Sequence, residues 1–404
     1  MAKHPKQPPG KPMRSDAFPM LFNRMEFAGC LGDLGTLLPI SIGMIVLNGL
    51  NATNVMFTVG LFYILAGLYF KVPVPVQPMK VIGAYAIAVG LTPTQIIAAS
   101  LWMGIIVLFM GTTGLIHTIG KYTPKSTIRG VQLGVGVILM MKGLNFMIQP
   151  DPNLAIQALG PMNMGIILGI MGMAVTLLLL DNRKIPAAIV VIFGGILVGL
   201  VIGHPLNLNN LKIGFHLPRI FPYGMPSYSD ILWVLPVLVL PQIPMTVGNA
   251  ILSNTDVMHE YFGEKAGRAS YRSIANSQGI ADIISFILGG IPMCHGAGGL
   301  AAMVRFGART AGANLMIGGI FVLLALLLGQ NVLVILNLLP LSILGVLLVF
   351  AGVQLALMIR DLKKRKDLFV ALIMLGFTLT VNLAVAFIFG IVIAYALKSA
   401  KVNV

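Results

Sequence analysis

Apolar stretches of roughly 20 residues recur along the whole chain, and this repetition limits its fold more than any other feature. A helix needs about 20 apolar residues to cross the hydrocarbon core of a bilayer. Fourteen candidate spans can be placed, at 26–47, 53–71, 75–90, 94–117, 126–147, 162–180, 186–203, 230–254, 271–290, 293–308, 312–336, 340–359, 368–382 and 383–399. The sequence therefore predicts an all-α polytopic membrane protein.

The composition excludes a soluble globular enzyme and gives the spans an orientation. Hydrophobic residues make up 57% of the chain and charged residues 10%, whereas soluble domains carry roughly 25% charge. In the fourteen-span arrangement, 23 of the 27 lysines and arginines fall on the side of the N-terminus, three on the other side, and Lys80 within a span. The positive-inside rule then places both termini in the cytoplasm of a cell-membrane protein. The net charge of +15 is thus no sign of nucleic-acid binding.

The chain divides into two similar halves. The predicted parts are a disordered cytoplasmic tail (1–24), spans one to seven (25–203), an external linker loop (204–229) and spans eight to fourteen (230–404). Pro78-Met79 and Pro292-Met293 occur at matching places, in the third and tenth spans. Because each half has an odd number of spans, the halves lie in opposite orientations, which predicts a 7+7 inverted repeat.

The third and tenth spans, 75–90 and 293–308, are short and irregular. Closely spaced prolines open the first and favour an extended backbone. A glycine cluster opens the second and allows backbones to approach closely. We expect a short extended stretch and then a half-helix in each. Paired, interrupted spans of this kind indicate a transporter binding site, and two ordinary Pro-kinked helices are the alternative.

Two polar side chains begin these half-helices. Lys80 begins the first, where a buried lysine costs a few kcal/mol unless it meets an anion. His295 begins the second and could donate a hydrogen bond or a proton. Helix N-termini add positive dipole ends that favour anions. The structural alternatives are an ion pair between Lys80 and Asp33, and a histidine held by backbone groups.

The first span carries Glu26, Cys30 and Asp33 at i, i+4 and i+7, on one helical face. Asp33 is expected to couple protons or to pair with Lys80, whereas Glu26, near the cytoplasmic end, is expected to be solvated. Cys30 and Cys294 belong to no metal pattern. Both are interpreted as small buried side chains, with a functional thiol as the alternative.

Polar stripes mark the eighth and ninth spans. In the eighth span the stripe consists of Gln242, Thr246, Asn249, Ser253 and Asp256, and two prolines are expected to interrupt the helix. Such a face avoids lipid, so it lines a cavity or joins helices, and we favour the cavity. In the ninth span the stripe consists of Gln278, Asp282 and Ser285, for which we favour helix packing.

Several of these segments resemble known signatures. Residues 32–40 and 292–301, the latter followed by 305–310, look like the two signatures of the molybdate transporters related to sulfate permeases. Residues 75–80 match the same family, and residues 276–292 resemble the wider sulfate-permease and uracil-permease superfamily. The resemblance implies a core domain of spans 1–4 and 8–11 and a gate domain of spans 5–7 and 12–14. It also implies substrate between the two half-helices, an elevator movement and a homodimer.

The leading functional hypothesis is transport of a tetrahedral oxyanion, molybdate first and sulfate second, with possible coupling to protons. The candidate substrate-binding residues are Thr36, Gln77, Pro78, Met79, Lys80, Gln242, Thr246, Asn249, Cys294, His295, Gly296, Ala297 and Gly298. The candidates for proton coupling or charge pairing are Asp33, Asp256 and His295. No cofactor or metal is expected. A carboxylate or nucleobase carrier and a passive anion channel stay open, whereas an intramembrane enzyme is disfavoured because His259-Glu260 does not continue as H-E-x-x-H.

Overall fold

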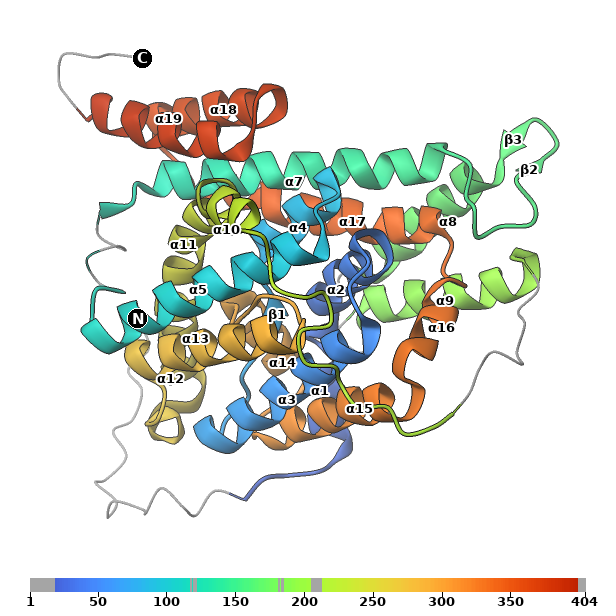
Figure 1. Ribbon diagram of the computed structural model, residues 1–404, viewed down its shortest axis with the longest axis horizontal. Coiled ribbons are helices and arrows are strands. Elements are labelled where there is room, and N and C mark those ends of the chain that lie inside the picture. The colour runs from blue at the N-terminus through green and yellow to red at the C-terminus, as the bar shows by residue number, and fades with distance from the viewer. Residues whose placement is uncertain are drawn as a thin grey trace, which may run out of the picture.

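The structure is almost wholly helical (Figure 1). This computed structural model describes residues 19–116, 118, 122–180, 182, 185–204 and 213–398. Within these residues, six helices are long and apolar enough to cross a membrane, or seven if one bent pair counts as a single span. The predicted tail up to residue 18 and residues 205–212 of the predicted linker lie outside the described part.

The helices follow the predicted spans closely. In the first half they are α1 (Arg24–Leu31), α2 (Leu34–Asn48), α3 (Ala52–Phe70), α4 (Lys80–Val89), α5 (Pro93–Thr113), α7 (Lys125–Ile148), α8 (Met164–Leu179) and α9 (Ala187–Ile202). In the second half they include α13 (Tyr271–Leu288), α14 (Ala297–Phe306), α15 (Gly312–Leu328), α16 (Val332–Leu336), α17 (Leu341–Ala356), α18 (Arg365–Thr380) and α19 (Leu383–Ala396). Five of the apolar helices have only 10–17 residues, so the count of fourteen spans stays a prediction.

Two short strands meet in the middle of the fold. Strand β1 (Gln77–Pro78) pairs antiparallel with β4 (Met293–Cys294), with Gln77 opposite Cys294. The N–H of Met79 adds a bond of 2.8 Å to the carbonyl oxygen of Pro292. Each strand leads into a half-helix, α4 or α14. This confirms the predicted extended entries, and mutual pairing satisfies backbone groups that lipid could not.

The first span differs from the prediction of one continuous helix. Helices α1 and α2 meet at an angle of 47° around Gly32 and Asp33. A methyl group at Gly32 would lie 2.6 Å from the carbonyl oxygen of Ala302 in α14. The absence of a side chain at Gly32 therefore lets α14 lie directly against the bend.

The eighth span also differs, because its prolines do not break it. It continues as α10 (Tyr228–Val234), η2 (Leu235–Val239), α11 (Leu240–Met245), η3 (Thr246–Ser253) and α12 (Asn254–Phe262). The segments η2 and η3 are π-helical. Since a proline has no N–H to donate within the helix, wider π turns on either side absorb the lost bonds.

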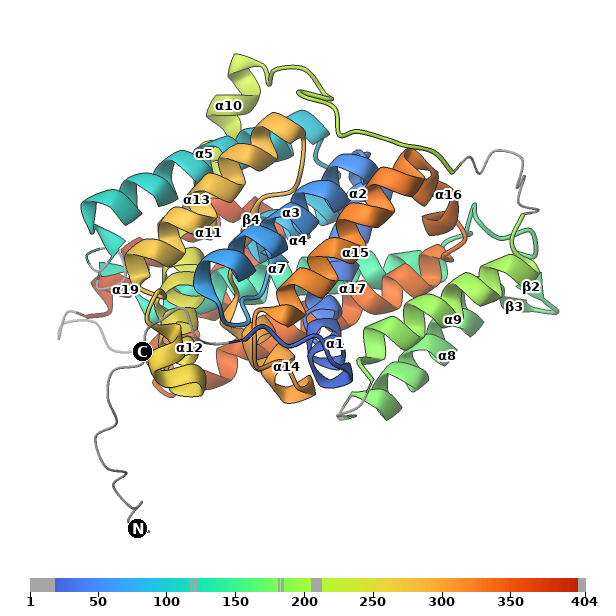
Figure 2. The ribbon, with the colours of Figure 1, turned by 90° about the horizontal axis from the view of Figure 1, so that it is seen from below.

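The long helices pack in pairs that join the two halves of the sequence. Helix α3 lies along α15, α5 along α13 and α7 along α17 (Figure 2). Contact is close where glycines face each other: a methyl group on Gly318 would lie 2.7 Å from the carbonyl oxygen of Gly60. Small residues of this kind let membrane helices pack through their backbones. Helices α18 and α19 lie against the outer side of α7 (Figure 1).

Candidate functional site

Asp33 anchors the first strand. Its carboxylate is fully buried and accepts hydrogen bonds from the Tyr63 hydroxyl, the Gln77 side-chain amide and the Val76 N–H, the last at 2.9 Å. The bend between α1 and α2 places it there. No ion pair joins Asp33 to Lys80 among the described residues. The alternative of a direct Lys80–Asp33 ion pair is therefore not what the structure shows, because neutral donors already occupy this carboxylate.

His295 is held on both sides of its ring. Its Nδ1 lies 2.8 Å from the Pro75 carbonyl oxygen, and its Nε2 lies 3.1 Å from the Ser277 hydroxyl. The side chain is fully buried, and the Phe62 ring lies 4.7 Å away, centroid to centroid. The predicted alternative of a satisfied, backbone-bonded histidine is thus what the structure shows.

The N-terminus of α4 is capped by a side chain from α11. The Gln242 amide oxygen accepts bonds from the N–H groups of Val81 and Ile82, at 3.0 and 3.3 Å. Its amide nitrogen donates to the Thr246 hydroxyl at 3.0 Å. Two of the N–H groups that were predicted to face an anion are therefore already satisfied, and Gln242 and Thr246 support the half-helix.

Replacing Gln242 with leucine is expected to lower the free energy of unfolding by about 2–4 kcal/mol, because two buried N–H groups lose their acceptor. Thermal unfolding of the purified protein in detergent measures this. The matched control is Gln330→Leu at an exposed position, where little change is expected. Equal melting temperatures for the two variants would contradict the capping role.

Helix α14 begins differently. Its cap residue is Gly296, which has no side chain to bond the first N–H groups. The first N–H groups of a helix have no partner inside the helix. A methyl group at Gly296 would lie 2.4 Å from the Gln77 amide oxygen, so β1 covers one side of this end. Gly298 is exposed on the other side, toward a cavity.

That cavity has a volume of about 340 Å³ and lies between two groups of helices. On one wall are α2, α4, α14 and η3, and on the other are α7, α8, α9 and α17. Four predicted binding residues line the first wall: Thr36, Lys80, Asn249 and Gly298. Further polar lining comes from Gln132, Thr176, Asn182, Arg305 and Gln354.

The charge of the cavity is one-sided. Among the described residues that line it, Lys80 and Arg305 are the charged ones, and both are cationic. The Lys80 ammonium group has no ion-pair or hydrogen-bond partner within the described part of the chain. A lysine in the membrane interior is costly without a counter-charge, so an anion in this cavity would offset the charge of Lys80.

Other predicted residues lie around the cavity and not in its lining, as far as the chain is described. These are Asp33, Gln77, Pro78, Met79, Gln242, Thr246, Cys294, His295, Gly296 and Ala297. Most form the strand crossing and its anchors. The Gln77 amide nitrogen is committed to Asp33, and its oxygen, which has no partner among the described residues, is an acceptor that repels an oxyanion.

The predictions for Asp256 and Glu26, a role in proton coupling or charge pairing and a solvated side chain respectively, differ from the structure. Asp256 is exposed and accepts a bond of 2.6 Å from the Tyr271 hydroxyl; the π turns of η3 rotate it away from the cavity. Glu26 is only 1% exposed, because both its carboxylate oxygens accept from the Arg309 N–H at 3.1 Å. It therefore joins α1 to the segment after α14.

The ninth-span stripe packs as predicted. Gln278, Asp282 and Ser285 are fully buried. The Asp282 carboxylate accepts from the Met293 N–H at 2.7 Å, so it anchors β4 as Asp33 anchors the segment leading into β1. Cys30 and Cys294 are both buried free thiols, which agrees with the interpretation as small packing residues.

A second hollow is larger and has one cationic side chain in its lining, Arg272, whose Nη2 donates to the Thr112 carbonyl oxygen at 2.7 Å. It has a volume of about 490 Å³ and lies between α3 and α13. Its lining is mostly apolar, and it contains none of the predicted binding residues. Sequence reasoning missed Arg305 and Gln132 of the first cavity, because nothing in their local sequence indicates that α14 and α7 face each other across it.

The chain is similar to several known transporters. A profile described as "Molybdate transporter of MFS superfamily" matches residues 25–139 and 235–355. Molybdate transporter 2 of Arabidopsis thaliana is 30% identical over 92% of this chain and 87% of its own length. Molybdate transporter 1 of Chlamydomonas reinhardtii is 28% identical, over 86% of each chain.

Solved structures show the same fold. The transmembrane domain of the cyanobacterial bicarbonate transporter BicA superposes with a TM-score of 0.62 at 17% identity, over 92% of this chain and 97% of that one. Murine Slc26a9, an anion transporter solved in the inward-facing state, superposes with a TM-score of 0.64 at 14% identity, over 93% and 68%.

Proposed function

The chain belongs to the molybdate transporter family, and from this premise we propose that it carries a tetrahedral oxyanion, molybdate first and sulfate second. The family resemblance predicted from the signatures is thereby confirmed. The protein is a multi-pass membrane protein with the fold of BicA and Slc26a9, and its family consists of anion transporters.

One observation carries the proposal. The cavity beside the strand crossing contains two cationic side chains and, among its described lining residues, no acidic one. A dianion would offset the unpaired Lys80 ammonium, with Arg305 as a second positive group. Charge-assisted hydrogen bonds from an ammonium group to an oxyanion are about twice as strong as neutral ones.

The remaining contacts follow from the same wall. Thr36 offers a hydroxyl and Asn249 an amide, both on the cavity lining. The N-terminal turn of α14 adds backbone N–H groups near Gly298 and a positive dipole end. Asp33, His295 and Gln242 act behind this wall, where they hold the two half-helices in place.

We further propose the 7+7 inverted repeat, with an elevator movement of core against gate. The helix pairing supports this repeat. If each span is replaced by the equivalent span of the other half, the pair α3–α15 becomes the pair α5–α13. The pairs β1–β4 and α7–α17 each join two equivalent segments, so the same replacement leaves them unchanged. The cavity supports the division, since one wall belongs to the proposed core and the other to the proposed gate. In the predicted orientation Arg305 is cytoplasmic, and on this ground we propose that the conformation is inward-facing. We propose a homodimer in the cell membrane with both termini in the cytoplasm.

Uptake by the purified protein in liposomes tests the function. Saturable molybdate uptake, with stronger competition from tungstate than from sulfate or uracil, is the expected result. Imposing a pH gradient shows whether protons are co-transported. Non-saturable flux would favour a passive channel, and uptake of uracil or a carboxylate in place of oxyanions would contradict the proposed substrate class.

A further inference from the structure

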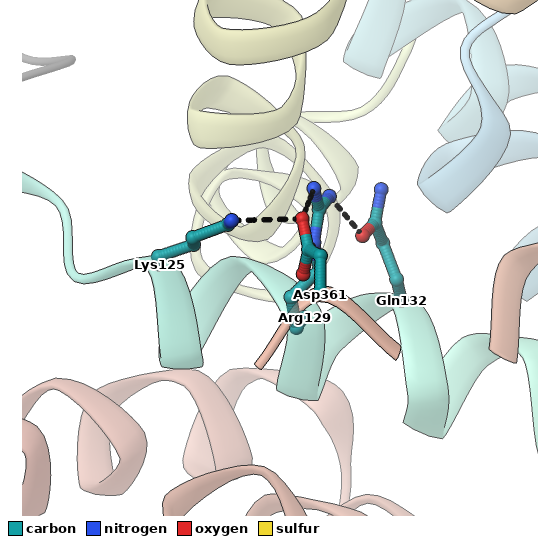
Figure 3. Close-up of polar contacts among 4 residues, drawn as sticks. All are labelled: Lys125, Arg129, Gln132 and Asp361. Carbon is teal, nitrogen blue, oxygen red and sulfur yellow. Dashed lines mark hydrogen bonds and ion pairs between the residues drawn. The ribbon is translucent and has the colours of Figure 1, made fainter. Parts of the chain in front are cut away.

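An ionic cluster lies beside the cavity, on α7 and on the segment η6 (Leu357–Asp361) that follows α17. The Arg129 guanidinium donates two hydrogen bonds to the Asp361 carboxylate, from Nε to Oδ1 at 3.0 Å and from Nη2 to Oδ2 at 2.6 Å. The Lys125 ammonium also approaches Oδ2, at 2.9 Å (Figure 3). This bidentate geometry fixes the guanidinium plane more firmly than a single contact would.

The third contact of Arg129 reaches a residue of the cavity. Its Nη1 donates to the Gln132 amide oxygen at 2.8 Å. A guanidinium group has only donors, so the atom facing it must be the oxygen of the amide. The NH₂ group of Gln132 is therefore turned away from Arg129 (Figure 3). Gln132 is 2% exposed overall and lines the cavity.

We propose that Gln132 is an anion-binding residue of the cavity, and that Arg129 and Asp361 are positioning residues that keep its NH₂ group directed into the cavity. The inference rests on the proposed oxyanion transport. An amide free to turn would present its oxygen half as readily as its nitrogen, and that oxygen would repel the substrate. The Arg129 bond removes this alternative by occupying the oxygen.

The position of Gln132 gives it a role that Lys80 cannot have. Lys80 belongs to α4 and Gln132 to α7; both residues line the cavity, and the two helices are in contact. An oxyanion bound to both connects the proposed core and gate, so its binding favours the closed arrangement of the two walls. The neutral amide adds donors without a further charge, which keeps release of the anion possible.

Molybdate binding to the purified full-length protein, measured by isothermal titration calorimetry, tests this proposal. Gln132→Leu removes the donor and is expected to weaken binding about tenfold, the effect of losing a hydrogen bond to a charged group. Gln132→Glu is expected to bind more weakly still, because a carboxylate faces the anion. Asp361→Asn is expected to weaken binding less than Gln132→Leu, and Asp361→Glu to restore it. The matched control is Lys363→Ala, for which unchanged binding is expected, since Lys363 is exposed and lies outside the cavity lining.

The possible results distinguish the proposed role of Gln132 from the proposed oxyanion transport. Unaltered protein that binds molybdate, together with Gln132→Leu and Gln132→Glu that bind equally well, would overturn the role of Gln132 and leave the function standing. Absence of oxyanion binding by the unaltered protein would overturn both. Melting temperatures are measured for every variant. If Gln132→Leu does not fold, Asp361→Asn and Asp361→Glu decide: equal affinity in both would contradict the positioning role.

Discussion

Replacing Lys80 with methionine is expected to lower molybdate uptake at least about a hundredfold while the protein stays folded. Removing one member of a buried charge pair costs about 3–5 kcal/mol, and about 1.4 kcal/mol corresponds to a factor of ten. The folded protein itself loses little, because Lys80 has no bonded partner among the described residues. Methionine keeps the apolar stem of the side chain.

Initial uptake rates in liposomes, at equal amounts of inserted protein, measure the effect. The matched control is Lys363→Met, at an exposed position outside the cavity, for which near-normal uptake is expected. Normal uptake by the Lys80→Met variant would remove Lys80 from the binding site.

Replacing Asp33 with alanine is expected to destabilise the folded protein, whereas replacing Lys80 is expected to impair transport alone. The buried N–H groups of Val76 and Gln77 would lose their acceptor, whereas the Tyr63 hydroxyl would keep the Val76 carbonyl oxygen at 3.1 Å. Each unsatisfied buried donor costs about 1–3 kcal/mol. For two donors the sum is about 2–6 kcal/mol, which is a large part of the stability of a typical domain, about 5–15 kcal/mol.

Size-exclusion profiles and thermal unfolding in detergent measure this loss. Asp256→Ala serves as the matched control, because Asp256 is exposed and accepts a single described bond, from Tyr271; the variant should fold and transport normally. A folded, stable Asp33→Ala protein that has lost only its response to a pH gradient would show that Asp33 is a proton-coupling residue and not an anchor.

The sequence was most informative where it departed from regular helix. The prolines before Lys80 and the glycines after His295 predicted two extended stretches with half-helices, and strands β1 and β4 confirm the stretches; their pairing with each other is a finding of the structure. The reason is local: proline and glycine restrict or free the backbone whatever surrounds them. Lys80 was located for a similar reason, since a lone cation in an apolar span needs an explanation wherever it lies.

Partners across the fold could not be predicted in the same way. Local sequence does not show that Asp33 holds Val76 and Gln77, that Gln242 caps α4, or that Glu26 accepts from Arg309. Each contact joins segments far apart in the chain. The prediction that Asp256 shares the polar face of the eighth span was wrong because it assumed 3.6 residues per turn, whereas the π turns of η3 are wider.

The position of bound molybdate tests the central claim most directly. Diffraction from crystals grown with molybdate, collected at the molybdenum absorption edge, locates the metal atom without any assumption about the site. We expect one strong anomalous peak in the cavity between α4, α14 and α7, with an oxyanion oxygen about 2.8 Å from the Lys80 Nζ. A peak in the hollow between α3 and α13, or any peak remote from Lys80, would contradict it.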